Sequence, residues 1–394
     1  MAKVKRAYQS PRFTVGQVIR QHWEYVENSV QFTAHQKRML RALANCRTIA
    51  LGAHQIGCKA CGTVQLACNS CRNRNCPNCQ NREREAWLAA RTSELLPVPY
   101  FHLVFTLPST LNELCLHHPK VMYGLLFEAT WYTIQKLGKD KKWLGAQTGM
   151  IAILHTWGSN LSLHPHLHCM VPAGGLDAKG NWKHSKSKGK YLFNRVVMGK
   201  VFRARFVKLM RKAIHKEQLP KLEESIFKAL FEKECITYAK CPFNHPQQIL
   251  NYIGRYSHKI AITNHRLLEV EEKTVKFSYK NYRKEGQKQE LTLSTQEFIR
   301  RFAMHIVPHK FIRIRHYGIL SNRNKKQALK AVSIALGKPI VTPISKVPKF
   351  ILAHNEQPHF CPCCRKVTVH VILDILPPVR GSPSKKQIPK QIRS

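Results

Sequence analysis

Histidines alternate along one short segment of the chain. The run from His164 to His168 reads His-Pro-His-Leu-His. In an extended strand every second side chain lies on the same face, so we expect His166 and His168 about 6 to 7 Å apart, with Leu167 turned toward the core. Two imidazoles placed in this way can chelate one divalent ion, although a pair can also be structural in a chain with 21 histidines. His164 needs a kink at Pro165 to reach the same ion.

Two tyrosines four residues apart form a second group with chemical potential. Tyr252 and Tyr256 lie in a stretch that favours a helix, residues 246–256, so they share one helix face, a spacing that packing alone also produces. Arg255 and Lys259 make the surroundings cationic, which stabilises a phenolate or a nearby phosphate. Together the two groups indicate a metal ion that polarises a scissile phosphate while a tyrosine hydroxyl attacks in line.

Paired cysteines form the third group. Cys58-Lys-Ala-Cys61-Gly and Cys76-Pro-Asn-Cys79 have the two-residue gap that lets thiolates converge on one tetrahedral zinc ion. We predict these four as the ligands, since the Gly and Pro beside them suit tight turns. A third pair keeps the ligand set open, and so does one histidine: these are Cys68, Cys71 and His54. Reduced cysteines in a core are the alternative.

Further cysteines and arginines surround these pairs. Cys361-Pro-Cys-Cys364, with His354, His359 and His370 nearby, is a candidate for a second zinc site. Arg72, Arg74, Arg82 and Arg84 lie in or just after the first cysteine cluster. Arginines on a folded zinc-binding region suit contacts to DNA phosphates, and we predict Arg72, Arg74, Arg255 and Lys259 as DNA-binding residues.

The charge of the chain points to a polyanionic partner. The 394 residues include 65 Lys and Arg against 22 Asp and Glu, a net charge of +43. Such a charge repels itself unless nucleic acid or another polyanion neutralises it. Asp140, Asp177 and Asp374 are the only aspartates. Nucleases with two metal ions need three or four converging carboxylates, so this composition disfavours that class.

The chain lacks the signals of membrane and nucleotide-binding proteins. No apolar run approaches the roughly 18 residues that span a bilayer, and residues 1–13 are basic without the apolar stretch of a signal peptide. We therefore expect a soluble, cytoplasmic protein of the bacterial type, associated with the nucleoid, without a membrane partner. No Gly-rich nucleotide loop is present, so we expect no nucleotide cofactor.

Strands and helices are expected to interleave without a regular βαβ rhythm, which indicates an α+β fold. Short apolar runs rich in aromatic and β-branched residues predict strands. We predict helices within 14–50 and over 81–96, 120–137, 197–216, 222–233 and 246–256, strands over 100–107, 150–156 and 167–171, and a hairpin over 260–270 and 274–279. Residues 179–190 are expected to form a mobile basic loop, and 377–394 a disordered tail.

The motifs resemble those of a known family. Phe105-Thr-Leu-Pro108, His166-Leu167-His168 and the Tyr252/Tyr256 segment follow the order of the three motifs of HUH rolling-circle nucleases. With the block from Trp157 to Cys169 and the cysteines ahead of it, the chain is similar to rolling-circle insertion-sequence transposases of family ninety-one. The resemblance runs from about residue 40 to 267. Asn75 departs from it, since the family often has His there.

The resemblance implies a ferredoxin-like palm (related to RRM folds) with an antiparallel sheet. It implies His166 and His168 as ligands of Mg²⁺ or Mn²⁺, and Tyr252 and Tyr256 as nucleophiles. The third metal ligand stays open among His102, Asn251 and Arg255. The expected domains are an N-terminal helical region (1–53), a zinc-binding domain with a following helix (54–96), the catalytic domain (97–285), a C-terminal region with the cysteine motif (286–376) and the tail (377–394).

The expected function is that of a DNA transposase that nicks and rejoins single-stranded DNA at the ends of a mobile element. The resemblance implies a 5′-phosphotyrosine intermediate, which conserves the phosphodiester energy so that rejoining needs no ATP. Two alternatives stay open at this point. One is a plasmid or phage rolling-circle replication initiator, and the other is a zinc-dependent DNA-binding protein without catalysis. The oligomeric state is not determined by the sequence.

Overall fold

The computed structural model describes most of the chain. The described residues are 11–79, 95–187, 191–232, 237–243, 260–323, 325–337, 361, 363–364 and 369–375. The predicted helix over 246–256 and the predicted tail over 377–394 lie outside them, as do all but the last two residues of the helix predicted over 81–96.

The chain divides into two compact units. The larger comprises Met1–Ala44 and Asn73–Asn355, and the smaller comprises Asn45–Arg72 and Glu356–Ser394. The smaller unit therefore combines two segments that are far apart in the sequence. This division differs from the predicted boundaries at 53/54, 96/97 and 285/286, because a strand near the carboxyl end pairs with a strand near the amino end.

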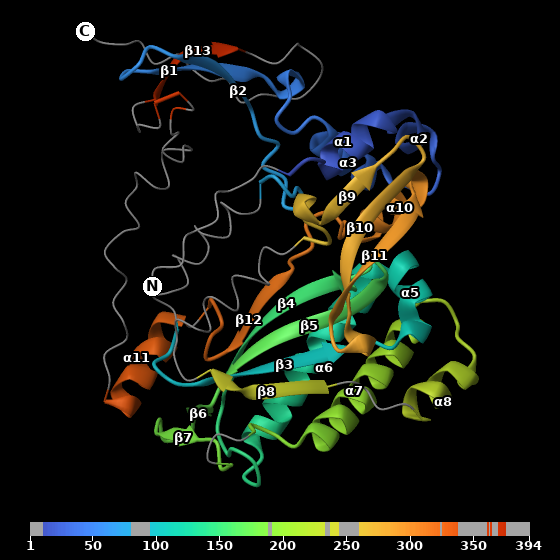
Figure 1. Ribbon diagram of the computed structural model, residues 1–394. Coiled ribbons are helices and arrows are strands. Elements are labelled where there is room, and N and C mark those ends of the chain that lie inside the picture. The colour runs from blue at the N-terminus through green and yellow to red at the C-terminus, as the bar shows by residue number, and fades with distance from the viewer. Residues whose placement is uncertain are drawn as a thin grey trace. The chain divides into compact units, whose positions relative to one another are not determined.

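A five-stranded antiparallel sheet forms the centre of the larger unit (Figure 1). Across the sheet its strands are β12 (Ile314–Gly318), β4 (Gly149–Trp157), β5 (Leu163–Pro172), β3 (Tyr100–Thr106) and β8 (Thr237–Phe243). The three predicted strands are confirmed as β3, β4 and β5. β5 is the central strand, with β4 on one side and β3 on the other.

The connectivity is that of a ferredoxin-like fold. Four helices accompany the sheet: α5 (Asn112–His117), α6 (Pro119–Lys139), α7 (Arg195–His215) and α8 (Glu224–Glu232). β3, α6, β4, β5, α7 and β8 follow one another as β-α-β-β-α-β, with strand order β8-β3-β5-β4. The predicted α+β class is therefore confirmed, and β12 adds a fifth strand beside β4.

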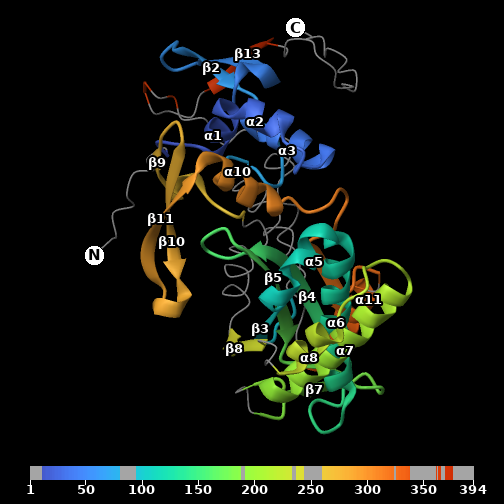
Figure 2. The ribbon, with the colours of Figure 1, turned by 90° about the vertical axis from the view of Figure 1, so that its right-hand side faces the viewer.

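Side-chain alternation gives the sheet two different faces. Leu103, Leu154 and Leu167 lie on one face of the sheet and are buried in the main core. Helices α5, α6, α7 and α8 pack on this face (Figure 2). On the opposite face Ile151 and Met170 belong to a second apolar cluster, which α11 (Lys325–Leu336) covers. The histidines lie on this opposite face, away from the main core.

The long helices begin where the sequence provides caps. The side chain of Asn194 accepts hydrogen bonds from the backbone N–H groups of Val196 and Val197 at the start of α7. α6 has Pro119 at its first position, where no N–H is needed. Among the described helices, none is both long enough and apolar enough to cross a membrane.

Three short helices and a second sheet also belong to the larger unit. The helices are α1 (Val15–Gln21), α2 (Trp23–Asn28) and α3 (Ala34–Ala44), and the sheet contains β9 (Leu267–Val270), β10 (Thr274–Asn281) and β11 (Gln287–Ser294), followed by α10 (Thr295–Met304). The predicted hairpin is confirmed as β9 and β10. Asn264 connects distant segments, because it accepts from the Val15 N–H at 3.0 Å and donates to Asn78 at 2.7 Å.

The basic insertion contains more structure than predicted. β6 (Gly174–Leu176) pairs with β7 (Trp182–His184), so part of the predicted loop over 179–190 is a strand. The Asp177 carboxylate accepts hydrogen bonds from the backbone N–H groups of Lys179 and Asn181, each at 2.9 Å. This local turn closes the hairpin, and the lysine-rich composition alone does not show it.

The smaller unit is built around one antiparallel sheet. Its strands are β1 (Ala53–Cys58), β2 (Val64–Cys68) and β13 (Val369–Ile375), in the order β13-β1-β2. The short 3₁₀ helix Ile49–Leu51 precedes β1. β13 comes some 300 residues after β1, so the sheet depends on a contact between distant parts of the chain.

We predict that Leu167→Ala destabilises the larger unit by about 2–5 kcal/mol, because Leu167 is fully buried in the main core on the central strand. Chemical denaturation monitored by circular dichroism measures this change. Leu116→Ala is the matched control, since Leu116 is 41% exposed and its truncation is expected to change stability by less than about 0.5 kcal/mol. Equal effects of the two substitutions would contradict the assigned core.

Candidate metal-dependent nuclease site

Three histidines converge on the face of the central sheet opposite the main core. His166 and His168 of β5 and His155 of β4 each offer a nitrogen, and these three atoms lie within 4.8 Å of one another. The strand register explains this, because His155 pairs directly with His166 in the β4–β5 ladder. The third residue of the group is thus His155. The sequence predicts a strand over 150–156 but gives no sign of a metal ligand at this position.

The three side chains fit a divalent cation. Imidazole nitrogens are common metal ligands, and no carboxylate belongs to this group among the described residues. Of Mg²⁺ and Mn²⁺, an all-imidazole set suits Mn²⁺ better, since Mg²⁺ prefers oxygen ligands. Three protein ligands also leave coordination positions for substrate oxygens.

Hydrogen bonding fixes which nitrogen of His166 is available. Its Nδ1 lies 2.6 Å from the backbone carbonyl oxygen of His164. A carbonyl oxygen only accepts, so Nδ1 carries the proton and donates it. The lone pair is then on Nε2, and this nitrogen is the one that can bind a cation.

His102 of β3 contacts His168 from the side. Its Nε2 lies 2.9 Å from Nδ1 of His168, and the two rings are stacked with centroids 5.1 Å apart. His102 is 2% exposed and does not belong to the group of three. When His168 binds a cation through Nε2, its Nδ1–H donates to His102, which fixes the ring orientation. Of the three candidates for the third ligand, His102 contacts His168 and is not in the group of three, while Asn251 and Arg255 lie outside the described residues.

An aromatic ring supports His155. Trp157, two residues along β4, stacks on the imidazole of His155 with centroids 4.6 Å apart and an interplanar angle of 20°. Arg313 lies over the indole at 5.3 Å. The indole therefore restricts the rotation of the His155 ring.

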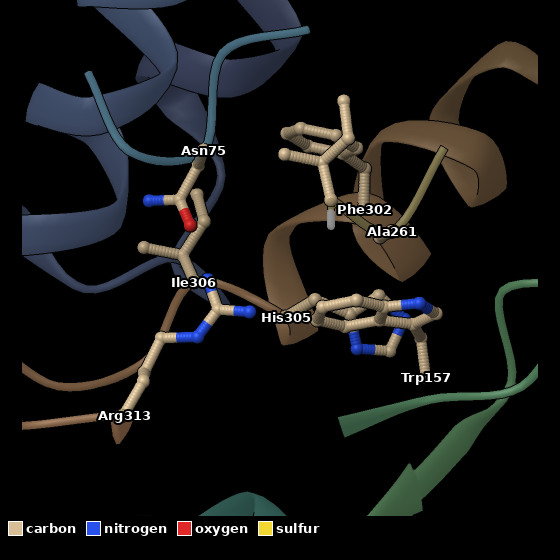
Figure 3. Close-up of a pocket in the computed structure, with 8 residues that line it drawn as sticks. Asn75, Trp157, Ala261, Phe302, His305, Ile306 and Arg313 are labelled. Atoms are coloured by element: carbon tan, nitrogen blue, oxygen red, sulfur yellow. The ribbon is translucent and has the colours of Figure 1, made fainter. Parts of the chain in front are cut away.

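A small pocket lies beyond Trp157 (Figure 3). Its lining residues are Asn75, Trp157, Ile260, Ala261, Phe302, His305, Ile306 and Arg313. His305 hydrogen-bonds Thr156 through Nδ1 and the Leu161 carbonyl through Nε2, each at 3.2 Å. Burial lowers the pKa of His305 to about 4, so this histidine is neutral and structural. The pocket packs the segment that begins at Ile260 against β4.

Asn75 occupies a position where the family often has His, and it is a buried side chain of this pocket. Its backbone N–H and its Nδ2 both donate to Oδ1 of Asn73, at 2.9 and 3.3 Å. Arg74 donates to the carbonyl oxygen of Phe311 at 2.9 Å, and burial lowers its pKa. Arg74 thus anchors a neighbouring loop, and its contact with DNA stays a prediction, as does that of Arg72.

The smaller unit brings together four thiols. Cys58, Cys61, Cys361 and Cys364 lie with their sulfur atoms within 4.8 Å of one another. The predicted zinc set joined Cys58 and Cys61 to Cys76 and Cys79, and that set stays a prediction. The β1–β13 pairing brings Cys361 and Cys364 to Cys58 and Cys61, and four thiols are a donor set that suits zinc.

Cys61 has the electrostatic character of a metal ligand. The hydroxyl and backbone N–H of Thr63 donate hydrogen bonds to its sulfur and lower the pKa of Cys61 to about 6. The thiolate is the form that binds zinc. His54 lies on β1 outside the group of four.

Cys76 and Cys79 lie in the larger unit, just after its boundary at Asn73. Both are buried, and the Cys79 N–H donates to the Cys76 carbonyl at 3.2 Å, which forms the predicted tight turn. Their binding of zinc stays a prediction. Tyr252, Tyr256, Arg255 and Lys259 lie outside the described residues.

Comparisons with known proteins identify the family. A family described as "Putative transposase" matches residues 149–328, and one described as "Transposase zinc-binding domain" matches residues 18–107. A Sinorhizobium fredii (strain NBRC 101917 / NGR234) protein named "Putative transposase y4qJ" is 38% identical over 387 residues, which cover 94% of this chain and 97% of that protein. The "Transposase for insertion sequence element IS801" of Pseudomonas savastanoi pv. phaseolicola is 30% identical, over 81% of this chain and 79% of that protein. The chain belongs to the IS91 family of transposases.

The two family matches fall on different sites of this transposase. The first spans His155, His166 and His168 together with both tyrosines, and the second spans the amino-terminal cysteines as far as Cys79. Both relatives are named as transposases, which favours this function over the replication initiator and the non-catalytic DNA-binding protein. A transposase is a DNA endonuclease and strand transferase, so the histidine face is the candidate catalytic surface.

We predict that His155→Ala weakens Mn²⁺ binding by more than 100-fold, because it removes one of three ligands. Manganese electron paramagnetic resonance or calorimetric titration measures the affinity. His184→Ala is the control, since His184 is exposed on β7 and away from the group of three. Unchanged Mn²⁺ affinity in His155→Ala would exclude His155 as a ligand.

We predict a smaller effect for the histidine behind the ligands. His102→Leu removes the hydrogen-bond acceptor of His168 and is expected to weaken Mn²⁺ binding by about 10- to 100-fold. His102→Gln retains an acceptor and should recover part of the affinity. The same titration distinguishes this positioning role from mere packing, since a packing role predicts no recovery by Gln.

Proposed function

We propose that this transposase nicks and rejoins single-stranded DNA at the ends of its mobile element through a 5′-phosphotyrosine intermediate. The observation that supports it most is the convergence of His155, His166 and His168 on one face of a ferredoxin-like sheet. Three converging imidazoles are suited to hold a cation beside a phosphate. The two sequence motifs and the family membership agree with this chemistry.

The proposed cation is Mn²⁺ or Mg²⁺. When bound, it polarises the scissile phosphate and neutralises the charge that develops on its oxygens. The protein's part is orientation: the His164 carbonyl fixes the His166 ring, His102 fixes the His168 ring, and Trp157 restrains His155. Preorganised ligands avoid the cost of arranging them during the reaction.

Chain connectivity supports a short distance between the tyrosines and the histidines. Ile260 lines the same pocket as Trp157, which stacks on His155. Tyr256 precedes Ile260 by four residues, so their Cα atoms are at most about 14 Å apart. If residues 246–256 form the helix that the sequence predicts, Tyr252 lies one further turn along the same helix face.

The proposed reaction is an exchange of one phosphodiester bond for another. A tyrosine phenol oxygen forms a bond to phosphorus, the bond to the 3′ oxygen breaks, and the phenol proton is transferred to that oxygen. The products are a 5′-phosphotyrosine and a free 3′-hydroxyl. Attack by a 3′-hydroxyl on the phosphotyrosine reverses the exchange and joins the strands. A second tyrosine lets the protein hold one strand while it cuts another.

The proposed substrate follows from charge and resemblance. A net charge of +43 favours a nucleic acid, and a transposase acts on DNA. The preference for single strands rests on the likeness of the motifs to HUH nucleases. Arg255 and Lys259 are proposed phosphate contacts because they flank the tyrosines in the sequence.

We predict that the double variant Tyr252→Phe/Tyr256→Phe forms no covalent adduct with a labelled single-stranded oligonucleotide that carries the element end. Each single variant should retain at most one adduct. Where the remaining phenol does not attack that strand, we expect adduct formation to fall by more than about 1,000-fold. Denaturing electrophoresis detects the adduct, and peptide mapping locates it.

Controls separate the nucleophile from the metal. Tyr282→Phe should behave as wild type, since Tyr282 is 75% exposed at the start of the short 3₁₀ helix Tyr282–Lys284, which follows β10. Chelation with EDTA should abolish the adduct, and Mn²⁺ should restore it more effectively than Mg²⁺. A covalent adduct in the double variant would show that the tyrosine assignment is wrong, and an adduct that persists in EDTA would exclude a metal-dependent reaction.

A further inference from the structure

We propose that Cys58, Cys61, Cys361 and Cys364 bind one Zn²⁺ ion that joins the two ends of the chain into the smaller unit. This inference does not rest on the proposed nuclease chemistry. The match to the transposase zinc-binding domain ends at residue 107, so that match does not include Cys361 and Cys364. In the proposed site the carboxyl-terminal segment supplies two of the four ligands, so zinc binding requires that segment.

The sulfur positions fit a tetrahedral zinc site. Sγ of Cys58 lies 3.6 Å from Sγ of Cys364, and Sγ of Cys61 lies 3.4 Å from Sγ of Cys361. In a tetrahedron with Zn–S bonds of about 2.3 Å, neighbouring sulfurs are about 3.8 Å apart. All four sulfurs are mutually close rather than grouped as two isolated pairs.

The distances exclude a disulfide. Disulfide sulfurs are about 2.05 Å apart, whereas the Cys58–Cys364 and Cys61–Cys361 sulfurs are 3.6 and 3.4 Å apart. Four thiols collected at one point without a bond between them are the arrangement that structural zinc requires. A Cys₄ set is closed, because it leaves no position for substrate, so the role of this ion is structural.

The backbone before β2 has the tight turn that such ligands need. The Gly62 N–H donates to the Cys58 carbonyl at 2.8 Å, and the Cys58 N–H donates to the Thr63 carbonyl at 2.9 Å. Gly62 has a φ of +68°, a left-handed conformation that favours glycine. This turn points both sulfurs of the first pair in one direction.

The smaller unit also lacks a hydrophobic core that would hold it together. Among its described side chains, Ile56 is the one large aliphatic residue that is buried, while Val64, Leu66 and Leu373 are about half exposed. A unit with so few buried apolar side chains gains stability from a structural metal. Zinc binding therefore supplies the free energy that keeps β13 paired with β1.

Cys363 provides a matched control inside the same motif. It lies between Cys361 and Cys364, is exposed, and does not belong to the group of four. A substitution there alters the same loop and the same residue type without removing a ligand. Any effect on zinc that is specific to Cys361 and Cys364 thus reflects coordination rather than disruption of the loop.

The test is the zinc content of the full chain, measured by mass spectrometry of the metal after gel filtration. We expect Cys361→Ser/Cys364→Ser to contain one zinc ion per chain fewer than wild type, and Cys363→Ser to match wild type. Cys58→Ser/Cys61→Ser and the quadruple variant should lose the same single ion. Unchanged zinc in Cys361→Ser/Cys364→Ser would overturn the proposal, and so would the loss of two ions in the quadruple variant.

A conservative variant guards against simple misfolding. Cys364→His should retain the ion as a Cys₃His site, whereas Cys364→Ser should lose it. Cobalt substitution reports the ligand type, and the thiolate-to-cobalt absorption per ion should fall in Cys364→His. An absorption spectrum identical to wild type would show that residue 364 is not a ligand. Loss of zinc from Cys364→His and Cys363→Ser alike would show that the loop, and not coordination, is responsible.

Discussion

The pairing of β5 between β3 and β4 is the constraint on which the candidate nuclease site depends. Side chains alternate along each strand, so one register places Leu167 in the main core and turns His166 and His168 to the opposite face. The same register sets His155 directly beside His166. A shift of one residue would bury the imidazoles and expose the leucine, which the buried core strongly disfavours. Hydrophobic packing on one face thus fixes metal-ligand geometry on the other.

The polar face has its own supporting contacts. His102 reaches His168 from β3, the His164 carbonyl holds His166, and Trp157 stacks on His155. Each contact comes from a backbone position that the sheet already fixes, so the imidazoles need little rearrangement to bind an ion. The pocket beyond Trp157 also contains Ile260 and Ala261.

The two candidate metal sites lie in separate units of this transposase. The histidine group offers three nitrogens, a set that would leave coordination positions for substrate, whereas the cysteine group offers four thiols, a closed set suited to a structural ion. Because β13 and Cys361 come from the far end of the chain, the smaller unit can form only after that end has been synthesised. Its formation thus depends on the carboxyl-terminal segment, and the large sheet does not share this dependence.

The sequence alone determined the local features: strands at β3, β4 and β5, the helices α6 and α7, the tight turns at the paired cysteines, and the shared face of His166 and His168. These follow from periodicity and residue type over a few positions. It missed β12, β11, His155 as a neighbour of His166, and Cys361 and Cys364 as partners of Cys58 and Cys61. Those depend on which strands pair, and strand pairing is decided by the burial of the whole core rather than by nearby residues. Spacing along the chain therefore indicates which residues are able to bind a metal ion. Only the tertiary structure decides which of these side chains lie close enough to bind the same one.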